Sequence, residues 1–462
     1  MKVACALGVA LLLFSSFASG QKVRNVFSFP NANSTTEPAE VALIQGRDGG
    51  LYGTTSGFGQ TLTDGTAFRV SLGGALNVLH TFNGEDGQFI EGGLTLAIDG
   101  NYYGTASQGG ASGAGTLFKV MSTGTFALLY QFTGGSDGGY PNAPPIQAAD
   151  GNLYGTTAAG TVYRYAPSSG TFSTILSLNA DGSQGQYVEA ALLQATDGTL
   201  YGTAEAGGAN GCGVIFRLTT SGTLLDVYSF ACGAGGTTPI SALMQASDGN
   251  FYGTTVEGGN ITSNRDCAFG CGTIYKLSHG LISTLYAFSG EPTDGAGTAA
   301  GLVEGTDGQL YGSTHDGGAN NHGTLYRIST SGQYQLLYSF AAIIGVNADG
   351  TLVQDTSGVF YGITTLGGKY GVGSVYNLNV GLSPFISLVR YTGRIGQPVQ
   401  ILGQGLTGST AVTINGIAAT SFKVVSDTYM TAVVPTGATT GPVVVTTPKG
   451  TLTSNHNFRI VQ

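Results

Sequence analysis

Short apolar segments separated by glycine-rich turns follow one another along most of the chain, in an order that repeats. The segment Leu51-Tyr52-Gly53-Thr54-Thr55 returns in variant form at intervals of 47 to 59 residues. Its seven copies are centred on Tyr52, Tyr103, Tyr154, Tyr201, Tyr252, Tyr311 and Tyr361. Asp-Gly precedes six of the seven, and Asp-Gly between apolar runs is a strong hairpin signal. Since no segment has a helical period, we predict an all-β protein.

Each repeat contains four predicted strands, which we term A to D in chain order. Examples are residues 191–195 for strand A, the Tyr-Gly-Thr segment itself for strand B, residues 115–120 for strand C and residues 336–340 for strand D. Strand D is aromatic in most repeats. Four strands in about 50 residues are typical of a β-propeller, in which each repeat forms one blade.

The seventh repeat lacks its own strand D after residue 378, and a matching segment lies at the other end of the chain, in residues 23–29. Pairing of these two segments closes a ring and removes exposed strand edges. We therefore predict a seven-bladed β-propeller closed by an N-terminal strand. The alternative, an open stack of hairpins, leaves the N-terminal segment unexplained.

Strand direction divides the connections between two faces. The A–B and C–D turns lie on one face, which we call the turn face. The B–C and D–A loops lie on the other and vary most in length and composition, so we call it the variable face. Binding residues are commonly placed on such loops above a rigid scaffold.

The repeat resembles the GloVer tandem repeat over about residues 23–380, through Asp-Gly-x-[Leu/Phe]-Tyr-Gly-Thr, a Gly-Gly loop and Gly-Thr-[Leu/Ile/Val]-[Phe/Tyr]-[Lys/Arg]. The resemblance implies a propeller in an exported bacterial protein, without an established activity. After residue 382 the pattern changes to dense β-branched strands. Residues 403–406, 412–416 and 434–443 resemble the IPT/TIG immunoglobulin-like domain. We expect a signal peptide in residues 1–20, the propeller in 21–381 and a small β-sandwich in 382–462.

The N-terminus has the features of a secretory signal. Lys2 precedes the apolar run from Ala4 to Phe14, and small residues end at Gly20. The run is too short to span a membrane, and no later segment is apolar enough to do so. Export favours disulfides over zinc for the four remaining cysteines. Of the three pairings, we favour Cys212 with Cys232 and Cys267 with Cys271.

Charge differs between the two parts of the chain, whose overall formal charge is −9. Residues 21–381 hold 11 basic and 25 acidic side chains, a net charge of −14, whereas residues 382–462 hold five basic and one acidic, a net charge of +4. Nucleic-acid binding needs a concentrated basic face, so we do not expect it. The C-terminal domain is interpreted as a spacer or adhesion module, and the protein as a monomer.

Motifs that suggest catalysis or metal binding are sparse. Residues 134–138 match G-x-S-x-G and residues 403–408 match G-x-G-x-x-G, but neither has the helix that those motifs require. His315, Asp316 and His322 form the one group of metal-ligand types in a variable-face loop. A solvated turn is the better interpretation of that group, so we assign no metal and no catalytic residue.

Acidic and aromatic residues recur in the D–A loops. Five of these loops contain Asp-Gly, and the carboxylates are candidates for Ca²⁺ binding or glycoside cleavage, whereas the simpler interpretation is a loop turn capped by aspartate. Aromatic residues of variable-face loops, including Phe58, Phe89, Phe269 and Tyr370, are candidates for stacking on sugars. The candidate ligand-binding residues are Asp86, Asp137, Tyr140, Asp181, Tyr187, Asp294 and Asp349.

These features favour an exported, non-enzymatic binding or adhesion protein, secreted or at the cell surface, whose variable face binds an extracellular glycan or a surface protein. One alternative is an extracellular glycan hydrolase or lyase that uses carboxylates of the variable face. A second is a purely structural surface component without a saturable ligand. No cofactor is expected, apart from Ca²⁺ at the carboxylates.

Overall fold

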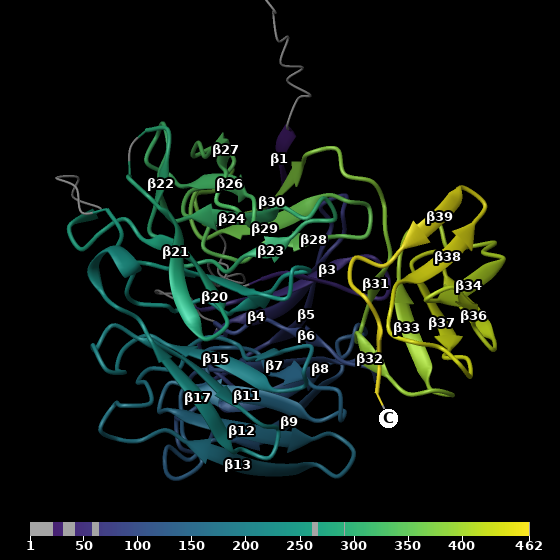
Figure 1. Cartoon of the computed structure of the whole chain (residues 1–462), viewed down its shortest axis with the longest axis horizontal. Coiled ribbons are helices and arrows are strands. Elements are labelled where there is room, and N and C mark those ends of the chain that lie inside the picture. The colour runs from purple at the N-terminus through teal and green to yellow at the C-terminus, as the bar shows by residue number, and fades with distance from the viewer. Residues whose placement is uncertain (1–21, 31–41, 58–63, 261–266, 291, 462) are drawn as a thin grey trace, which may run out of the picture.

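The computed structural model describes residues 22–30, 42–57, 64–260, 267–290 and 292–461 (Figure 1). Within these residues helical structure is confined to a 3₁₀ turn, η1 (Gly233–Gly235), and to Cys267, and all other regular structure is strand, as predicted. Residues 22–379 form seven four-stranded sheets, which we number as blades 1 to 7. The predicted signal sequence and Phe58 lie outside the described residues. No helix in the described part is long and apolar enough to cross a membrane.

The strands of each blade follow the predicted order A to D. Blade 1 contains β2 (Ile44–Gln45), β3 (Leu51–Thr55), β4 (Thr66–Val70) and β5 (Leu76–Thr81). Blade 2 contains β6 (Thr95–Leu96), β7 (Tyr102–Ala106), β8 (Thr116–Val120) and β9 (Phe126–Gln131). Blade 3 contains β10 (Ile146–Gln147), β11 (Leu153–Thr157), β12 (Thr161–Ala166) and β13 (Thr171–Ser177). Blade 4 contains β14 (Leu193–Gln194), β15 (Leu200–Ala204), β16 (Val214–Leu218) and β17 (Leu224–Ser229).

The remaining blades keep this order with two variations. Blade 5 contains β18 (Met244–Gln245), β19 (Phe251–Thr255), β20 (Thr273–Ser278) and β21 (Leu281–Ala287). Blade 6 contains β23 (Val303–Glu304), β24 (Leu310–Thr314), β26 (Thr324–Ile328) and β27 (Tyr334–Ser339), and a small pair, β22 (Gly295–Ala296) and β25 (Asp316–Gly317), joins two of its loops. Blade 7 contains β28 (Val353–Gln354), β29 (Phe360–Thr364), β30 (Ser374–Asn379) and β1 (Lys22–Ser28).

Strand B explains why Tyr-Gly-Thr is the most regular part of the repeat. All five positions of β11 are buried, and its glycine, Gly155, pairs with Tyr163 of strand C. A Cβ at Gly155 would lie 2.3 Å from the ring of Tyr163, so only glycine lets that ring lie flat on strand B. The same contact recurs between Gly253 and Tyr275.

The A–B turns differ in one detail from the sequence-based argument. Gly100 has a φ of +86°, but no aspartate of the Asp-Gly pairs has a positive φ among the described residues. Instead, the Asp99 carboxylate accepts hydrogen bonds from the backbone N–H of Asn101 (3.0 Å) and the hydroxyl of Tyr103 (2.7 Å). The aspartate thus ties the turn to the tyrosine of strand B.

Side chains of strand A link neighbouring blades. At six junctions, an amide or carboxylate oxygen at the second position of strand A accepts a hydrogen bond of 2.8–3.1 Å from a turn N–H of the preceding blade. The pairs are Gln147 with Ile98, Gln194 with Ala149, Gln245 with Thr196, Glu304 with Ser247, Gln354 with Thr306, and Gln45 with Thr356. The junction between blades 1 and 2 is the exception, because Leu96 occupies this position.

The N-terminal strand pairs as predicted. β1 is antiparallel to β30, with Val23 opposite Leu378 and Phe27 opposite Val375. Blades 7 and 1 also pack together, because Phe29, Phe68 and Val375 belong to one buried cluster. The hydrogen bond from Thr356 to Gln45 crosses the same junction, so the first and last repeats contact each other as other neighbours do.

The C-terminal part forms two further four-stranded sheets around one core. One sheet contains β31 (Ser387–Leu388), β33 (Pro398–Leu402), β37 (Tyr429–Val433) and β36 (Phe422–Ser426). The other contains β35 (Ile417–Ala418), β34 (Ala411–Ile414), β38 (Val443–Thr447) and β39 (Gly450–Thr453). A parallel pair, β32 (Thr392–Gly393) and β40 (Arg459–Ile460), completes this sandwich. Its core includes Ile401, Met430 and Val445, all fully buried.

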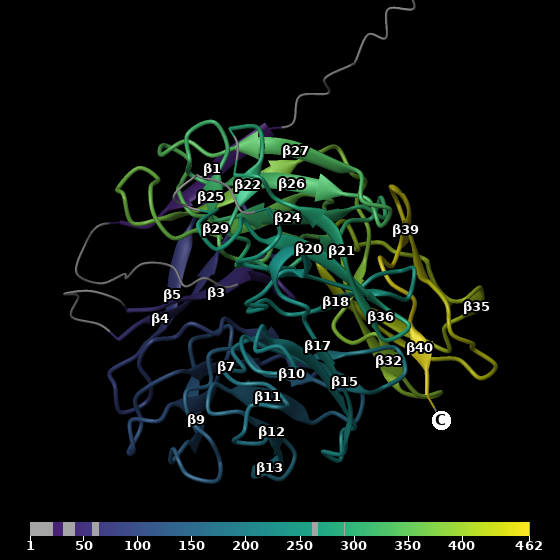
Figure 2. The same ribbon diagram turned by 60° about the vertical axis from the view of Figure 1, so that its left-hand side comes forward.

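The sandwich packs against the turn face of the blades (Figures 1 and 2). Side chains of Gln400, Arg390 and Arg459 donate hydrogen bonds to carbonyl oxygens of the turns of blades 2, 3 and 4. Thr428 contacts the turn of blade 1, and Phe385 and Gln404 contact that of blade 7. The C-terminal domain therefore covers the turn face, and its basic side chains bind turn carbonyls of the acidic part of the chain.

Candidate functional site

One position in each D–A loop that leads into blades 2 to 7 has a left-handed backbone. Phe89, Tyr140, Tyr187, Thr238, Gly297 and Asn347 occupy it, with φ between 53° and 62°. Its carbonyl accepts a hydrogen bond from the first residue after strand B, for example from Glu205 to Tyr187 at 3.0 Å. This bond fixes the conformation in blades 2 to 7. Glycine and asparagine adopt it readily, whereas aromatic and β-branched residues are strained by about 1–2 kcal/mol each.

Aromatic residues occupy this strained position in three consecutive blades, 2, 3 and 4. The residue after each ring is buried, as for Ile90, Pro141 and Val188. Tyr140 and Tyr187 nevertheless remain 49% and 56% exposed. The rings therefore contribute little to the core, and strain at exposed side chains is a signal of function.

Polar side chains accompany the aromatic residues two positions further along each loop. They are Glu91, Asn142 and Glu189, each partly buried. Each polar side chain therefore lies two residues from the ring of its own loop and is partly open to solvent. The Asn142 Nδ2 donates to Glu189 Oε1 across the blade junction at 3.4 Å. We call Tyr140, Asn142, Tyr187, Glu189 and Glu205 the aromatic–acidic site.

The electrostatics of this site distinguish Glu189 from other surface carboxylates. Burial, followed by the charge of Glu205, raises the pKa of Glu189, and the hydrogen bond from Asn142 opposes the shift. Glu205 lies against Tyr187, because its backbone N–H bonds the carbonyl of that residue. Two carboxylates, an amide and two exposed rings can bind hydroxyl groups and stack on an apolar sugar face.

Three of the predicted aspartates hold the outer strands of adjacent blades together. Asp86, Asp137 and Asp294 bond the ring groups of His80, Tyr130 and Tyr286, at 2.9, 2.9 and 3.1 Å. Each of these rings stacks on a ring of the next blade, with centroid distances of 3.8 Å to Phe126, 3.6 Å to Phe172 and 4.2 Å to Tyr334. Their carboxylates are thus used in a repeated structural contact.

The other two predicted aspartates have different surroundings. Asp181 is exposed and caps a turn through the N–H and hydroxyl of Ser183. Asp349 is buried and accepts from Nδ1 of His315 at 2.8 Å, while Asn347 bonds the other ring nitrogen. The five aspartates are therefore not gathered around one centre. Among the described residues, no group of three or more His, Cys, Asp or Glu is placed to hold a metal ion.

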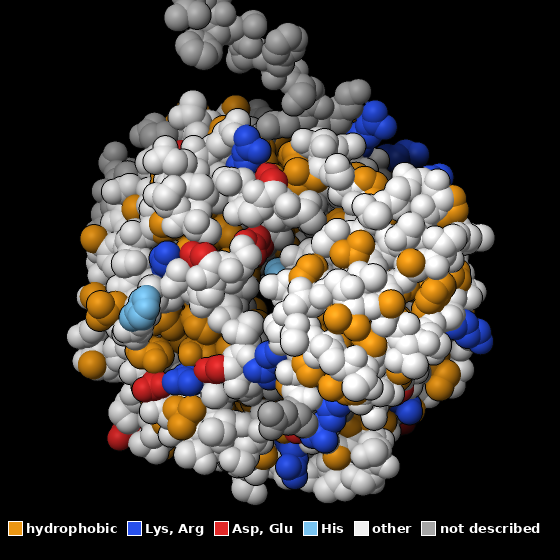
Figure 3. Space-filling model, turned by 45° about the vertical axis from the view of Figure 1, so that its right-hand side comes forward, with side chains coloured by type: hydrophobic (Ala, Val, Ile, Leu, Met, Phe, Trp, Pro, Cys, Tyr) orange, Lys and Arg blue, Asp and Glu red, His pale blue; other side chains and the backbone are white. Residues whose placement is uncertain are grey.

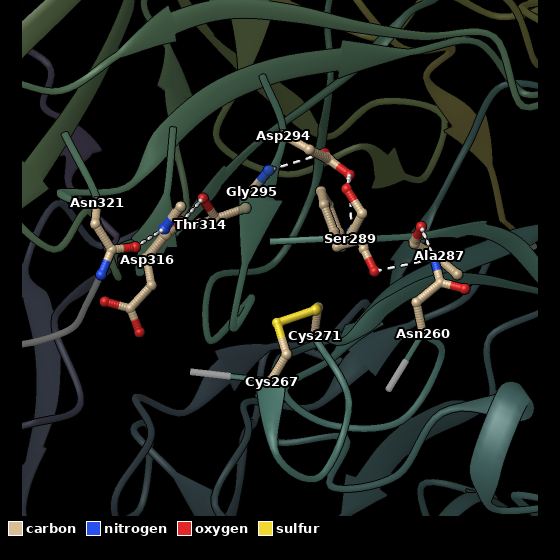
Figure 4. The surroundings of a disulfide bond; sticks show 12 residues. Asn260, Cys267, Cys271, Ala287, Ser289, Asp294, Gly295, Thr314, Asp316 and Asn321 are labelled. Atoms are coloured by element: carbon tan, nitrogen blue, oxygen red, sulfur yellow. Dashed lines mark hydrogen bonds between the residues drawn. A yellow bond between two sulfur atoms is a disulfide. The ribbon is translucent and has the colours of Figure 1, made fainter. Parts of the chain in front are cut away.

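Both predicted disulfides are present. Cys212 pairs with Cys232 and joins a B–C loop to the following D–A loop. Cys267 pairs with Cys271 within the B–C loop of blade 5. In Figure 4 this second disulfide lies beside Asn260, while Asp294 points toward Ser289 and Gly295, to which it is hydrogen-bonded. Phe269 is 74% exposed at the tip of the disulfide loop, and Tyr370 lies in the B–C loop of blade 7.

The fold defines a propeller-like repeat protein with a C-terminal immunoglobulin-like sandwich. The chain matches the Gloeobacter/Verrucomicrobia repeat over residues 12–161, 158–266 and 261–409, and the IPT/TIG domain over residues 384–460. It therefore belongs to the Gloeobacter/Verrucomicrobia repeat family. No curated protein matches the chain. A solved structure of a gluconolactonase from Xanthomonas campestris is 14% identical and covers 61% of this chain and 91% of its own, with a TM-score of 0.36.

The sequence analysis identified the two tyrosines of the site but missed Asn142, Glu189 and Glu205. The signal for the first two was the pattern aromatic-x-[Glu/Asn], present as Phe89-Ile90-Glu91, Tyr140-Pro141-Asn142 and Tyr187-Val188-Glu189. Aligning the D–A loops from strand A backward brings these three segments together. Glu205 had no such signal, because the residues at the same position of the other repeats are of different types.

Proposed function

We propose that the protein is a secreted or surface-held binding protein whose variable face binds a glycan at the aromatic–acidic site. The observation that supports this most is the pair of strained, half-exposed tyrosines, Tyr140 and Tyr187, in adjacent blades. Aromatic rings stack on the apolar faces of sugars, while Asn142 and Glu189 offer hydrogen bonds to hydroxyl groups. Two disulfides and the predicted signal sequence support an oxidising, extracellular location.

Charge narrows the class of glycan. Glu189 and Glu205 lie on the site, and the repeat part of the chain carries a net charge of −14. Polymers of uronic acids would be repelled, so we propose a neutral or amino-sugar glycan. The IPT/TIG domain contacts the opposite face, which leaves the aromatic–acidic site facing away from it.

The test uses variants that remove a ring and relieve strain at the same time. Tyr140→Gly and Tyr187→Gly replace residues with a φ of 60° and 58°, which glycine adopts freely. We expect both variants to fold at least as stably as the parent and to lose binding on a glycan array at least about tenfold. Thr238→Gly is the matched control, because Thr238 has a φ of 62° in blade 5 without a ring. It should gain stability and keep binding.

Two outcomes would replace this function with another. If the protein selectively binds a surface protein and gives no signal on the glycan array, its function would be protein recognition. Absence of any saturable ligand for the parent protein would favour a purely structural role.

A second candidate is an extracellular glycan hydrolase, favoured by the raised pKa of Glu189 beside Glu205. A carboxyl group with a raised pKa suits a general acid, and a nearby carboxylate suits the second role in glycoside cleavage. Mass spectrometry of glycans incubated with the protein tests this. If cleavage products form with the parent protein and disappear with Glu189→Gln while binding persists, the protein is a glycan hydrolase. If the glycan binds but is not altered, the hydrolase function is excluded.

A further inference from the structure

A cavity lies where the C-terminal domain meets the turn face, on the opposite side from the aromatic–acidic site. Strands β10, β14 and β18 form one wall, and residues 389–392 and 454–459 of the IPT/TIG domain form the other. Its volume is about 780 Å³, within the range of small-molecule sites, which commonly lie between domains. Figure 3 views the molecule from this side and shows a hollow where the two domains meet.

The ionisable side chains that line this cavity are basic or histidine, apart from Tyr391, although the repeats around it are acidic. Arg390, Arg459 and His456 line it, and none of the lining residues is an aspartate or glutamate. The Nε of Arg459 is buried and has no hydrogen-bond partner in the described structure. A buried guanidinium N–H without an acceptor needs an explanation, and an anion or a water supplies one.

The nearest carboxylates are already used elsewhere. Asp150 acts on Arg390 through its charge, but its oxygens accept from Asn152 and Tyr154. Glu304 acts on His456, but both of its oxygens accept from Ser247. Burial lowers the pKa of His456, so its imidazole is neutral at pH 7.

The wall formed by the blades is apolar apart from groups that are already hydrogen-bonded. Gln147, Gln194 and Gln245 accept from turn N–H groups and donate to turn carbonyls, so their amides are occupied. Between them, Leu192, Leu243 and Met244 face the cavity. Apolar surface on one side and guanidinium groups on the other suit a ligand with an apolar body and an anionic end.

We propose that this interdomain cavity binds a small organic anion, a carboxylate carried on an apolar body. Its carboxylate is held by Arg459 and Arg390, and its apolar body packs on the strand A residues of blades 3 to 5. The guanidinium groups come from the IPT/TIG domain and the apolar wall from the repeats, so neither domain forms the site alone.

Calorimetric titration of the full chain with two probes of equal shape tests the proposal. The first probe is 4-phenylbutyrate, and the second is the uncharged 4-phenyl-1-butanol. We expect the carboxylate to bind at least about tenfold more tightly than the alcohol. Arg459→Gln and Arg390→Gln should each weaken the carboxylate at least about tenfold. Arg394→Gln, at an exposed arginine of the same domain outside the cavity, should change nothing.

Met244→Trp provides a variant that keeps both arginines and fills the apolar wall. It should abolish binding of both probes, while small-angle scattering shows whether the two domains stay docked. The proposal is overturned if the alcohol binds as tightly as the carboxylate, or if Arg394→Gln weakens binding as much as Arg459→Gln. Absence of carboxylate binding up to about 5 mM by a docked parent protein would overturn it equally.

Discussion

The two faces of the blades are built from the same repeat but differ in what their side chains do. On the turn face, aspartates bond groups of their own blade, strand A glutamines bond the preceding blade, and the turn carbonyls of blades 1 to 4 and 7 bond the IPT/TIG domain. On the variable face, Tyr140 and Tyr187 are exposed on a strained backbone and Glu189 has a raised pKa. The turn face thus joins the blades to one another and to the second domain, whereas the variable face, which also holds both disulfides, carries side chains that cost stability.

The junction between blades 1 and 2 shows how closely the turn face depends on the second domain. Leu96 stands where other blades have glutamine or glutamate, so the usual link is missing. There, Arg47 donates to the carbonyl of Ile98 and to Gln400, and Gln400 donates to the same carbonyl. A residue of the IPT/TIG domain therefore completes the link that the repeat lacks. This contact fixes the IPT/TIG domain on the turn face at the junction between blades 1 and 2.

Tyr429→Ala is expected to have the largest effect, because it removes a buried apolar contact between the two domains. Tyr429 is 9% exposed, belongs to one cluster with Leu96 and Tyr102, and lies under Arg47, 4.7 Å from its ring centroid. We expect a loss of about 3–4 kcal/mol in denaturant unfolding. Tyr187→Ala makes the same change on the variable face and should cost less than about 0.5 kcal/mol. Equal losses would contradict the difference between the faces.

Gln194→Leu sharpens the comparison by making one complete junction resemble that of blades 1 and 2. Gln194 accepts from the N–H of Ala149 at 2.8 Å, and the leucine would leave that group without its partner. We expect a loss of about 1–3 kcal/mol in the free energy of unfolding. Gln335→Leu, at an exposed position of β27, is the control and should change it by less than about 0.5 kcal/mol. A neutral Gln194→Leu would show that the strand A links are dispensable.

The sequence predicted most of the fold because the repeat encodes it locally. Turn glycines, alternation and the unpaired segment at residues 23–29 each indicate one strand or one pairing, and the favoured one of three cysteine pairings is the one present. The docking of the IPT/TIG domain was not predictable, because it depends on surfaces that meet only after both domains fold. The surroundings of the D–A aspartates were not predictable for another reason. Asp137 and Asp349 are both followed by glycine, which makes them look equivalent in the sequence. When residues are counted back from strand A, however, Asp349 occupies the position of Glu189, and Asp137 does not.

Asp137→Asn tests the structural role of a residue first considered as a ligand. Asp137 accepts from Tyr130 and Thr133, both at 2.9 Å, and we expect a loss of about 1–2 kcal/mol at pH 7. Although burial acts in the opposite direction, the hydrogen bonds from Thr133 and Tyr130 hold the pKa of Asp137 below its usual value. Its contribution is therefore complete above the ordinary aspartate pKa of about 3.9 and is lost as the pH falls through the lower folded value.

The control for this variant is Asp181→Asn, because Asp181 contacts only its own turn in the described structure. It should leave the unfolding midpoint at pH 7 nearly unchanged, because an asparagine oxygen can accept the same two hydrogen bonds from Ser183. If Asp137→Asn retained full stability at pH 7, the ring-holding role of Asp86, Asp137 and Asp294 would be wrong.

Glu189→Gln is expected to have the smallest effect, and its sign is opposite to that of the other variants. Burial and then the charge of Glu205 raise the pKa of Glu189, so its ionised form is less favourable in the folded protein than in the unfolded chain. At pH 7.5 the neutral glutamine removes this penalty, and Tm should rise. Below the ordinary glutamate pKa of about 4.3 the parent residue is protonated in both states, so the gain should vanish.

The control is Glu85→Gln, at an exposed glutamate of another D–A loop, which should show neither the gain in Tm nor its dependence on pH. A gain that persists at pH 4 would mean that packing, not charge, causes it. A gain confined to neutral pH identifies Glu189 as a charge that folding does not require, which is the property expected of a residue retained for a ligand.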